Sequence, residues 1–333
     1  MKAIVLEGIN EPLQLKDVND PIAAPGEVIV KLKAAAFNRR DWWIQHGQYA
    51  GLKFPIILGS DGCGVVAAVG EGVDASWIGK EVIIDPSLNW GDSEDFQQKS
   101  YNILGLPHDG TFAELVNVPA ANLHLKPAYL TAEEAAAFPL AGVTAFRALF
   151  TKGKCKAGDK VLIVGVGGGA AMFALQFAVA AGAEVYVTSS SQEKIDMAVE
   201  MGAKGGVNYK DADWAAQLKA MAGSINVAVD SALGEGFAKL TDLAAPGGRI
   251  VFFGGTAGDV PALNGRHIFW KQLTILGSTM GTAKDFQAML DFINEHQLRP
   301  VIDEIFPMED ADQALHRMDT GSSKSGKIVL TID

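Results

Sequence analysis

Cysteine is scarce in this chain of 333 residues, with only Cys63 and Cys155 present. Two cysteines cannot build a disulfide framework or a four-thiolate metal site. No apolar run approaches the roughly 18 residues that a membrane-spanning helix needs. Positive charge is also in short supply, because the net charge is −11 and the isoelectric point lies near 5.0. This acidity argues against nucleic acid as a partner. The first residues form a strand-like run without a signal-peptide pattern, so we expect a cytoplasmic, globular protein that binds no membrane.

The chain changes character near residue 125. Before that point, short strand-like runs alternate with turn signals, which is typical of a small all-β barrel or sandwich. After Gly158, strands alternate with helices, which indicates a doubly wound parallel sheet. The length favours two domains, so we predict an α/β protein with a β-rich part and a parallel-sheet part. The predicted strands and helices of the second part are Lys160–Val164, Gly169–Ala181, Glu184–Thr188, Ser191–Met201, Val227–Asp230, Phe237–Ala244, Arg249–Gly254 and Leu273–Leu276.

A glycine-rich turn joins the first strand and first helix of the second part. It matches the G-x-G-x-x-G/A pattern at Gly165, Gly167 and Ala170. The first glycine permits a tight turn, the second lets the backbone approach a pyrophosphate, and the small third residue permits close packing of helix on strand. The strand–turn–helix context favours a dinucleotide site over a purely structural turn. The predicted cofactor-binding residues of the turn are Gly165, Gly167, Gly168, Gly169 and Ala170.

The end of the next strand indicates which nicotinamide cofactor is used. An NAD site places a carboxylate about 20 residues past the turn, where it binds the ribose 2′-hydroxyl. Here neither Thr188 nor Ser189 is acidic, and Ser189, Ser190 and Lys194 are the predicted cofactor-binding residues of this segment. Hydroxyls and a nearby ammonium suit a 2′-phosphate, so we predict NADP as the cofactor. The alternative is that Ser191 only caps a helix and Lys194 is a solvated residue.

Several segments together resemble the medium-chain dehydrogenase/reductase superfamily. They are Ala24–Val28, Leu58–Val66, Gly110–Glu114 and Ala141–Ala145. The branch that the chain resembles is that of the zinc-independent quinone and enone reductases, whose members are often named zinc-type alcohol dehydrogenase-like proteins. The resemblance implies a GroES-like β-barrel catalytic domain over residues 1–125 and 283–333. It also implies a Rossmann NADP-binding domain over residues 126–282, with the substrate between the two.

The resemblance also indicates that no metal is bound. The zinc-dependent branch needs a cysteine where Asn38 stands, a histidine where Ser60 stands, and a third ligand near Leu140 and Ala141. An amide and a hydroxyl are poor zinc ligands, and Asp61 alone cannot hold the metal. We therefore predict that the chain has no zinc site.

The segment Phe37–Tyr49 resembles the quinone-reductase pattern N-x-x-D-x-x-x-x-x-G-x-Y. Asn38, Asp41 and Tyr49 fall on its positions and are the candidate catalytic residues. The resemblance implies that Asn38 and Tyr49 donate hydrogen bonds to the substrate oxygen, and that Tyr49 delivers a proton directly or through water. Asp41 fits a structural partner near the cofactor better than a base. Two plainer alternatives stay open, in which Asn38 caps a helix and Tyr49 only forms a wall of the cleft.

The same resemblance places further residues around the cofactor. It implies contact of Thr144 with the nicotinamide and puts Tyr209 near the adenosine phosphate. Residues that end two late strands are expected to meet the carboxamide, namely Phe253, Gly254, Gly255, Ser278 and Thr279.

The predicted function is NADPH-dependent transfer of hydride to a quinone, an enone or another activated carbonyl without zinc. An activated acceptor is favoured because its oxyanion is delocalised and a few hydrogen-bond donors can stabilise it. The alternatives are a zinc-dependent alcohol dehydrogenase with a degenerate site and a non-catalytic NADPH-binding sensor. Leu273–Leu276 is a short, uncharged run at the expected edge of the parallel sheet, which predicts a homodimer.

Overall fold

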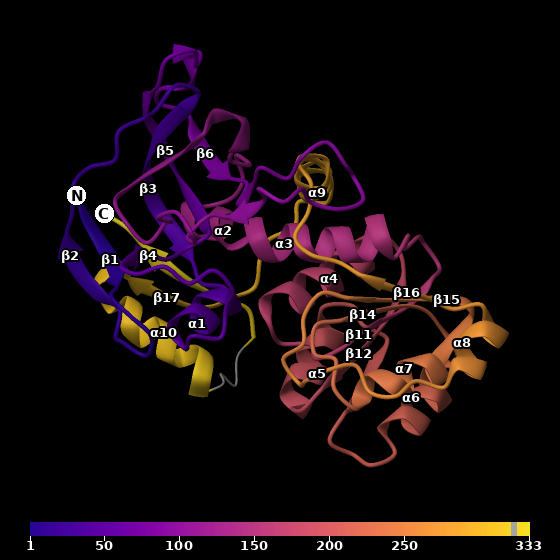
Figure 1. Cartoon of the computed structure of the whole chain (residues 1–333). Coiled ribbons are helices and arrows are strands. Elements are labelled where there is room, and N and C mark those ends of the chain that lie inside the picture. The colour runs from indigo at the N-terminus through magenta and orange to yellow at the C-terminus, as the bar shows by residue number, and fades with distance from the viewer. Residues whose placement is uncertain (321–324) are drawn as a thin grey trace. The chain divides into compact units, whose positions relative to one another are not determined.

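The structure is a computed structural model that describes residues 1–320 and 325–333, without the side chains of residues 319 and 320. It divides into two compact units (Figure 1). The first contains Met1–Ala141, the segment that begins at Thr282, and Lys327–Asp333, while the second contains Gly142–Gly281. The first boundary therefore lies at Ala141 rather than at residue 125. The reason is that helix α2 (Ala132–Ala137) buries Ala135, Ala136 and Ala137 and packs against strands of the first unit.

A mostly antiparallel sheet is the centre of the first unit. Its order is β10-β6-β5-β3-β18-β17, and β9 pairs with the first half of β3. Its strands are β3 (Glu27–Ala36), β5 (Asp61–Val69), β6 (Glu81–Ile84), β9 (Leu115–Pro119), β10 (Leu123–Leu125), β17 (Ile302–Pro307) and β18 (Lys327–Thr331). Strand β18 pairs with Ala34–Ala36 of β3, so the end of the chain returns to the first unit.

Two smaller sheets and several helices complete the described part of the first unit. The smaller sheets contain β2 (Gln14–Asp17), β1 (Lys2–Leu6) and β4 (Ile56–Ile57), and separately β7 (Ser87–Leu88) and β8 (Asn102–Ile103). Besides α2, the helices are α1 (Arg39–Gln45), α9 (Ala283–His296) and α10 (Ala311–Thr320). Helix α2 begins with a capping box, because the Thr131 hydroxyl accepts from Glu134 N–H while the Glu134 carboxylate accepts from Thr131 N–H. The core draws apolar side chains from the sheets and from α1 and α10.

The second unit is built on a six-stranded parallel sheet with the order β13-β12-β11-β14-β15-β16. Its strands are β11 (Lys160–Ile163), β12 (Glu184–Ser189), β13 (Gly205–Asn208), β14 (Ile225–Asp230), β15 (Ala244–Phe252) and β16 (Thr274–Gly277). The chain order reverses between β11 and β14, and ligands of doubly wound sheets bind at the carboxyl ends of strands beside such a reversal. The predicted fold class, a GroES-like domain and a doubly wound parallel sheet, is confirmed.

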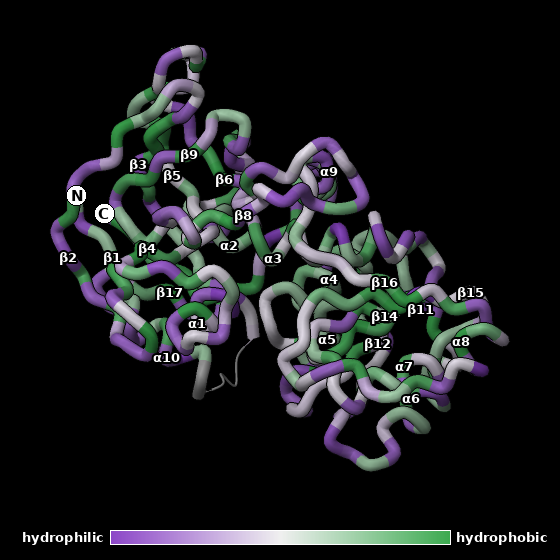
Figure 2. The backbone as a smooth tube through the Cα atoms, in the orientation of Figure 1, coloured by the Kyte–Doolittle hydropathy of each residue, from purple (hydrophilic) through white to green (hydrophobic). Residues whose placement is uncertain are grey.

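Helices connect the parallel strands. They are α4 (Gly169–Ala180), α5 (Gln192–Glu200), α6 (Trp214–Ala222), α7 (Gly236–Leu243) and α8 (Gly265–Lys271). Helix α3 (Pro139–Phe146) carries the chain from one unit to the other and continues into a π-helical turn at Arg147–Lys152. Hydropathy follows burial, because the central strands β11, β12 and β14 are hydrophobic and the outer loops are hydrophilic (Figure 2). In the described part of the chain, every helix is too short or too polar to cross a membrane.

Candidate active site

Asn38 and Asp41 lie at the start of helix α1, directly after strand β3. Asp41 is fully buried, and its Oδ2 accepts from Asn38 N–H at 2.8 Å while its Oδ1 lies 3.4 Å from the Gly59 nitrogen. Burial is the main cause that raises the pKa of Asp41 to about 6, and the Arg40 charge opposes this shift. Both carboxylate oxygens therefore bind backbone N–H groups, as the expected structural role of Asp41 requires.

The Asn38 amide belongs to a buried group with two charged side chains. Its Nδ2 donates to Asp61 Oδ2 at 2.9 Å, and its Oδ1 accepts from Lys327 Nζ at 2.7 Å. Lys327 also donates to Asp61 Oδ2 at 3.0 Å, and Leu140 N–H donates to Asp61 Oδ1 at 2.8 Å. Asn38 is thus the N-cap of α1 and forms a capping box with Asp41, as one of the alternatives expected, while its amide also binds a carboxylate and an ammonium.

Ser60 holds a hydroxyl where the zinc-dependent branch has a histidine. Its Oγ donates to Leu104 O at 2.7 Å and accepts from Arg40 Nη1 at 2.8 Å. Arg40 Nη1 also donates to Leu104 O at 2.9 Å. A guanidinium therefore lies directly against the hydroxyl at this position.

The residues at the zinc-ligand positions do not fit a zinc ion. Tetrahedral zinc needs thiolate, imidazole or carboxylate ligands. Asn38 and Ser60 offer none of these groups. The Asp61 carboxylate is paired with Lys327, and the nearby Arg40 cation would repel a zinc ion. Among the residues that the structure describes, no group of three or more His, Cys, Asp or Glu side chains is arranged to hold a metal.

Tyr49 is half-buried and lies next to Arg40. The guanidinium carbon is 5.2 Å from the centroid of the Tyr49 ring, which is cation–π distance. The structure thus brings Tyr49 to the site that contains Asn38 and Asp41, and it brings in three residues that the sequence pattern did not select: Arg40, Asp61 and Lys327. The one sequence signal for Lys327 is a charged residue at the start of an apolar strand, and its two partners are hundreds of residues away along the chain.

In the second unit, the glycine-rich turn has the geometry that a pyrophosphate site needs. Gly165 and Gly167 have φ values of +70° and +132°, which side-chain-bearing residues rarely adopt. A Cβ at Gly167 would stand 2.9 Å from Lys194 Cδ, so the Lys194 side chain lies against the turn. Gly168, Gly169 and Ala170 lead into α4, and a Cβ on Gly168 would meet open space. Backbone N–H groups at this helix start are available to an anion.

The hydroxyls at the end of β12 divide into two kinds. Thr188 and Ser189 are buried, with Thr188 Oγ1 accepting from Gly165 N–H and Ser189 Oγ donating to Val166 O. They fix the glycine turn to the neighbouring strand. Ser190 is half-buried and follows the strand, and Lys194 is in the first turn of α5.

The residues that the resemblance assigns to the nicotinamide side all lie in the second unit. Phe253, Gly254 and Gly255 directly follow β15, and Ser278 and Thr279 directly follow β16, so both groups are at the carboxyl edge of the sheet. Thr144 is buried, and its Oγ1 lies 3.6 Å from Met280 Sδ. Ser278 Oγ is buried and has no hydrogen-bond partner among the residues that the structure describes. Tyr209 is 44% exposed just after β13.

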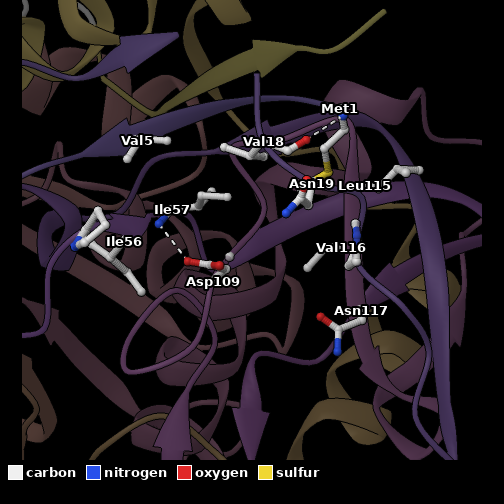
Figure 3. A pocket seen from close by; sticks show the side chains of 13 residues that line it. Met1, Val5, Val18, Asn19, Ile56, Ile57, Asp109, Leu115, Val116 and Asn117 are labelled. Carbon is white, nitrogen blue, oxygen red and sulfur yellow. Dashed lines mark hydrogen bonds between the residues drawn. The ribbon is translucent and has the colours of Figure 1, made fainter. Parts of the chain in front are cut away.

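A pocket of about 310 Å³ opens elsewhere in the first unit (Figure 3). Met1, Val5, Ile57, Asp109 and Val116 are among its lining residues. Two of its polar groups have partners, since the terminal ammonium donates to Val18 O and Asp109 Oδ1 accepts from Ile57 N–H. The pocket contains none of the predicted site residues.

Comparison with known proteins agrees with this arrangement. Residues 24–128 match the family described as alcohol dehydrogenase GroES-like domain, and residues 169–295 match the family described as zinc-binding dehydrogenase. A zinc-type alcohol dehydrogenase-like protein, YogA, from Leptosphaeria maculans is 36% identical over 96% of this chain and 95% of its own. An acryloyl-coenzyme A reductase from Metallosphaera sedula is 29% identical over 99% of this chain and 100% of its own.

Solved structures show the same fold. The crystal structure of an NAD-dependent alcohol dehydrogenase superposes with a TM-score of 0.92 at 37% identity, and the match covers 100% of both chains. The family models thus match a segment in each unit, and the relatives match this chain over nearly their full length. The chain therefore belongs to the medium-chain dehydrogenase/reductase superfamily of oxidoreductases, among its zinc-type alcohol dehydrogenase-like members.

Proposed function

We propose that this oxidoreductase transfers hydride from NADPH to a quinone, an enone or another activated carbonyl, and that it does so without zinc. The observation that carries the proposal is the contact between Arg40 Nη1 and Ser60 Oγ at 2.8 Å. A guanidinium against the residue at the expected zinc-ligand position supports an enzyme that handles negative charge with hydrogen-bond donors instead of a metal.

The second unit supplies the cofactor side of this function. The turn at Gly165–Ala170 would bind the pyrophosphate through backbone N–H groups. Ser190 and Lys194 would meet a ribose 2′-phosphate, while the backbone after β15 and β16 would meet the carboxamide. When bound, the cofactor supplies the hydride.

The first unit supplies the substrate side. Tyr49 would donate a hydrogen bond to the substrate oxygen and would hand on a proton from its hydroxyl or from water. Asn38 is a positioning residue in this scheme, because its amide joins Asp61 to Lys327. Asp41 positions α1 through its bonds to Asn38 N–H and Gly59 N–H.

The names of the relatives cover two kinds of substrate. One is named for an acryloyl thioester, an activated alkene conjugated to a carbonyl, and the others for alcohols. Conjugated acceptors are favoured here because their enolate oxyanion is stabilised by delocalisation and needs no metal cation.

The test is a survey of NADPH oxidation by the purified protein. Quinones, enones, enoyl thioesters and simple aldehydes are offered in turn, and loss of cofactor absorbance is followed, with alcohol oxidation by NADP⁺ and NAD⁺ as the comparison. We expect turnover with at least one conjugated acceptor at a kcat/KM well above that for simple aldehydes. Tight NADPH binding without turnover for any acceptor would point instead to a cofactor-binding sensor.

A further inference from the structure

Arg40 is a buried cation whose hydrogen bonds reach no carboxylate, although its charge acts through space on the buried Asp41 carboxyl group. It is 7% exposed, and its hydrogen bonds go to two neutral oxygens, Ser60 Oγ and Leu104 O. In the part of the chain that the structure describes, no Asp or Glu oxygen lies within 4.0 Å of the guanidinium. Burial of a cation is costly when its donors reach only neutral oxygens, and an anionic oxygen from a ligand would offset that cost.

Further unsatisfied polar groups surround this guanidinium. Among the described residues, the buried Arg40 Nε has no hydrogen-bond partner, and the buried hydroxyls of Tyr101 and Ser87 have at most each other. Burial raises the pKa of Tyr101, and Arg40 and Tyr49 are near enough to influence that pKa in opposite directions. We call Arg40, Tyr49, Ser87 and Tyr101 the Arg40 cluster.

The cluster is rich in donors and lacks an anionic acceptor. Arginine donates up to five hydrogen bonds and accepts none, and the phenol and serine hydroxyls can each donate one. An oxygen that carries negative charge would satisfy several of these donors at once. Tyr49 is half-buried and covers the guanidinium, so the cluster borders the surface of the first unit at this residue.

We propose that the Arg40 cluster binds the carbonyl oxygen of the substrate and stabilises the negative charge that this oxygen gains during reduction. This inference rests on the proposed reductase function. A hydride adds to the carbonyl carbon, or to the β-carbon of an enone, and the displaced π pair moves onto the oxygen. The alkoxide or enolate then takes a proton from the Tyr49 hydroxyl or from water, which leaves an alcohol or a saturated carbonyl compound.

The Arg40 charge lowers the pKa of the buried Asp41 carboxyl group, so its removal favours the protonated form of Asp41 and strands no charge below about pH 6. Leu104 O still accepts from Ser60 Oγ when the guanidinium is removed, so no buried carbonyl loses its only donor. Replacement of an unpaired buried cation by an apolar side chain of similar length removes a desolvation cost. A catalytic role therefore predicts that activity falls while stability holds or rises, whereas a structural role predicts that both fall.

The test compares Arg40→Met, Arg40→Lys and Arg39→Met, the last as a control that removes the same charge from the exposed neighbouring residue. Four quantities are measured: kcat with the best acceptor, KM for NADPH, the thermal midpoint, and the affinity for benzoate from tryptophan fluorescence. Benzoate presents a planar pair of anionic oxygens to the cluster.

We expect Arg40→Met to lower kcat by about 100- to 1000-fold, as loss of an oxyanion donor does. Its KM for NADPH should stay within about twofold, because its contact is with the substrate oxygen. The thermal midpoint should equal or exceed that of the wild type, and benzoate binding should be lost. Arg40→Lys should retain part of both functions, and Arg39→Met should bind benzoate as the wild type does.

Two results would overturn the inference. One is an Arg40→Met variant that keeps kcat within about threefold of the wild type. The other is a variant that melts at a lower temperature and still binds benzoate, which would make Arg40 a structural residue. If the wild type reduces no acceptor, the proposed function fails, and the benzoate and stability measurements still decide whether the cluster binds anions.

Discussion

Lys327 in strand β18 donates a hydrogen bond from Nζ to Oδ2 of Asp61 in strand β5, at a distance of 3.0 Å. Their side chains are 4% and 0% exposed, so the ion pair lies in the interior of the first unit. The two residues are 266 positions apart, and the Asn38 amide binds both. Lys327, near the end of the chain, thus completes a buried polar group whose other members are Asn38 and Asp61.

Lys327→Met should destabilise the first unit strongly. The substitution leaves the Asp61 carboxylate buried without its cation, and the breaking of a buried pair costs about 3–5 kcal/mol. The double variant Lys327→Met with Asp61→Asn should recover much of that loss, because no charge is then stranded. Urea unfolding measures the free energy of unfolding of both variants.

The control, Lys33→Met, removes an exposed ion pair to Glu81 and should lower the free energy of unfolding by about 1 kcal/mol or less. Equal losses for Lys33→Met and Lys327→Met would contradict the account.

The buried carboxyl group of Asp85 should make stability depend on pH. Burial, with help from the nearby Asp285, raises its pKa from 3.8 to about 8. Between these values the folded chain keeps a proton that the unfolded chain has lost. Stability should therefore fall as pH rises from about 4 to about 8, by at most about 1.4 kcal/mol per pH unit.

Asp85→Asn tests this dependence, because its amide oxygen can still accept from Ser87 N–H. The variant should melt at a higher temperature than the wild type at pH 8, and the two should converge as pH approaches 4. Melting curves across this range measure the difference. A constant difference at every pH would show that Asp85 does not titrate on unfolding.

Local patterns predicted the parallel sheet well. The glycine turn, strands β11, β12 and β14, and helices α4 and α5 were predicted to within a few residues, because alternation and glycine placement are local signals. Strand β13 was missed. It begins Gly205-Gly206, and glycine is disfavoured in strands, but a Cβ on Gly206 would stand 2.5 Å from Val187 Cγ2. Close packing therefore selects glycine here against its propensity.

The candidate site was predicted only in part. The pattern around Asn38, Asp41 and Tyr49 is local, and the structure brings these residues to one unit. The partners that define their roles are Asp61, Lys327 and Arg40, and hydrogen bonds across the sheet join them. No spacing in the sequence encodes a contact between β5 and β18, so the roles became visible only in three dimensions.

Activity should survive removal of metal ions. The zinc-ligand positions hold Asn38 and Ser60, and both side chains are hydrogen-bonded to other groups. We expect less than stoichiometric zinc by elemental analysis and unchanged NADPH oxidation after prolonged dialysis against a chelator. A zinc-dependent alcohol dehydrogenase assayed in parallel shows that the chelator treatment works. Loss of activity that added zinc restores would overturn the zinc-free assignment.

We propose that the chain forms a homodimer through strand β16. The structure confirms that β16 is the edge of the parallel sheet, and α8, which leads into it, exposes Phe269 and Trp270 at 66% and 83%. An unpaired edge beside exposed aromatic side chains favours pairing with a second copy. Light scattering should give twice the chain mass, and Ile275→Lys should halve it. Val199→Lys, at an exposed position on α5, is the control and should leave the mass unchanged.

NADPH should bind more tightly than NADH, by about tenfold or more, which corresponds to about 1.4 kcal/mol per decade. Ser190 and Lys194 flank the expected position of the ribose 2′ group, and no carboxylate ends β12. This preference differs from the cofactor in the name of a relative at 37% identity, which is called NAD-dependent. Ser190→Asp should shrink or reverse the preference, because its carboxylate repels a 2′-phosphate and accepts from a 2′-hydroxyl. Lys194→Ala should weaken NADPH binding alone.

Ser189→Ala is the matched control: the Ser189 hydroxyl donates to Val166 O and holds the glycine turn, so its loss should weaken the binding of both cofactors equally. Fluorescence titration of each variant with both cofactors measures these affinities. Equal dissociation constants of NADPH and NADH for the wild type would show that Ser190 and Lys194 do not form a 2′-phosphate site.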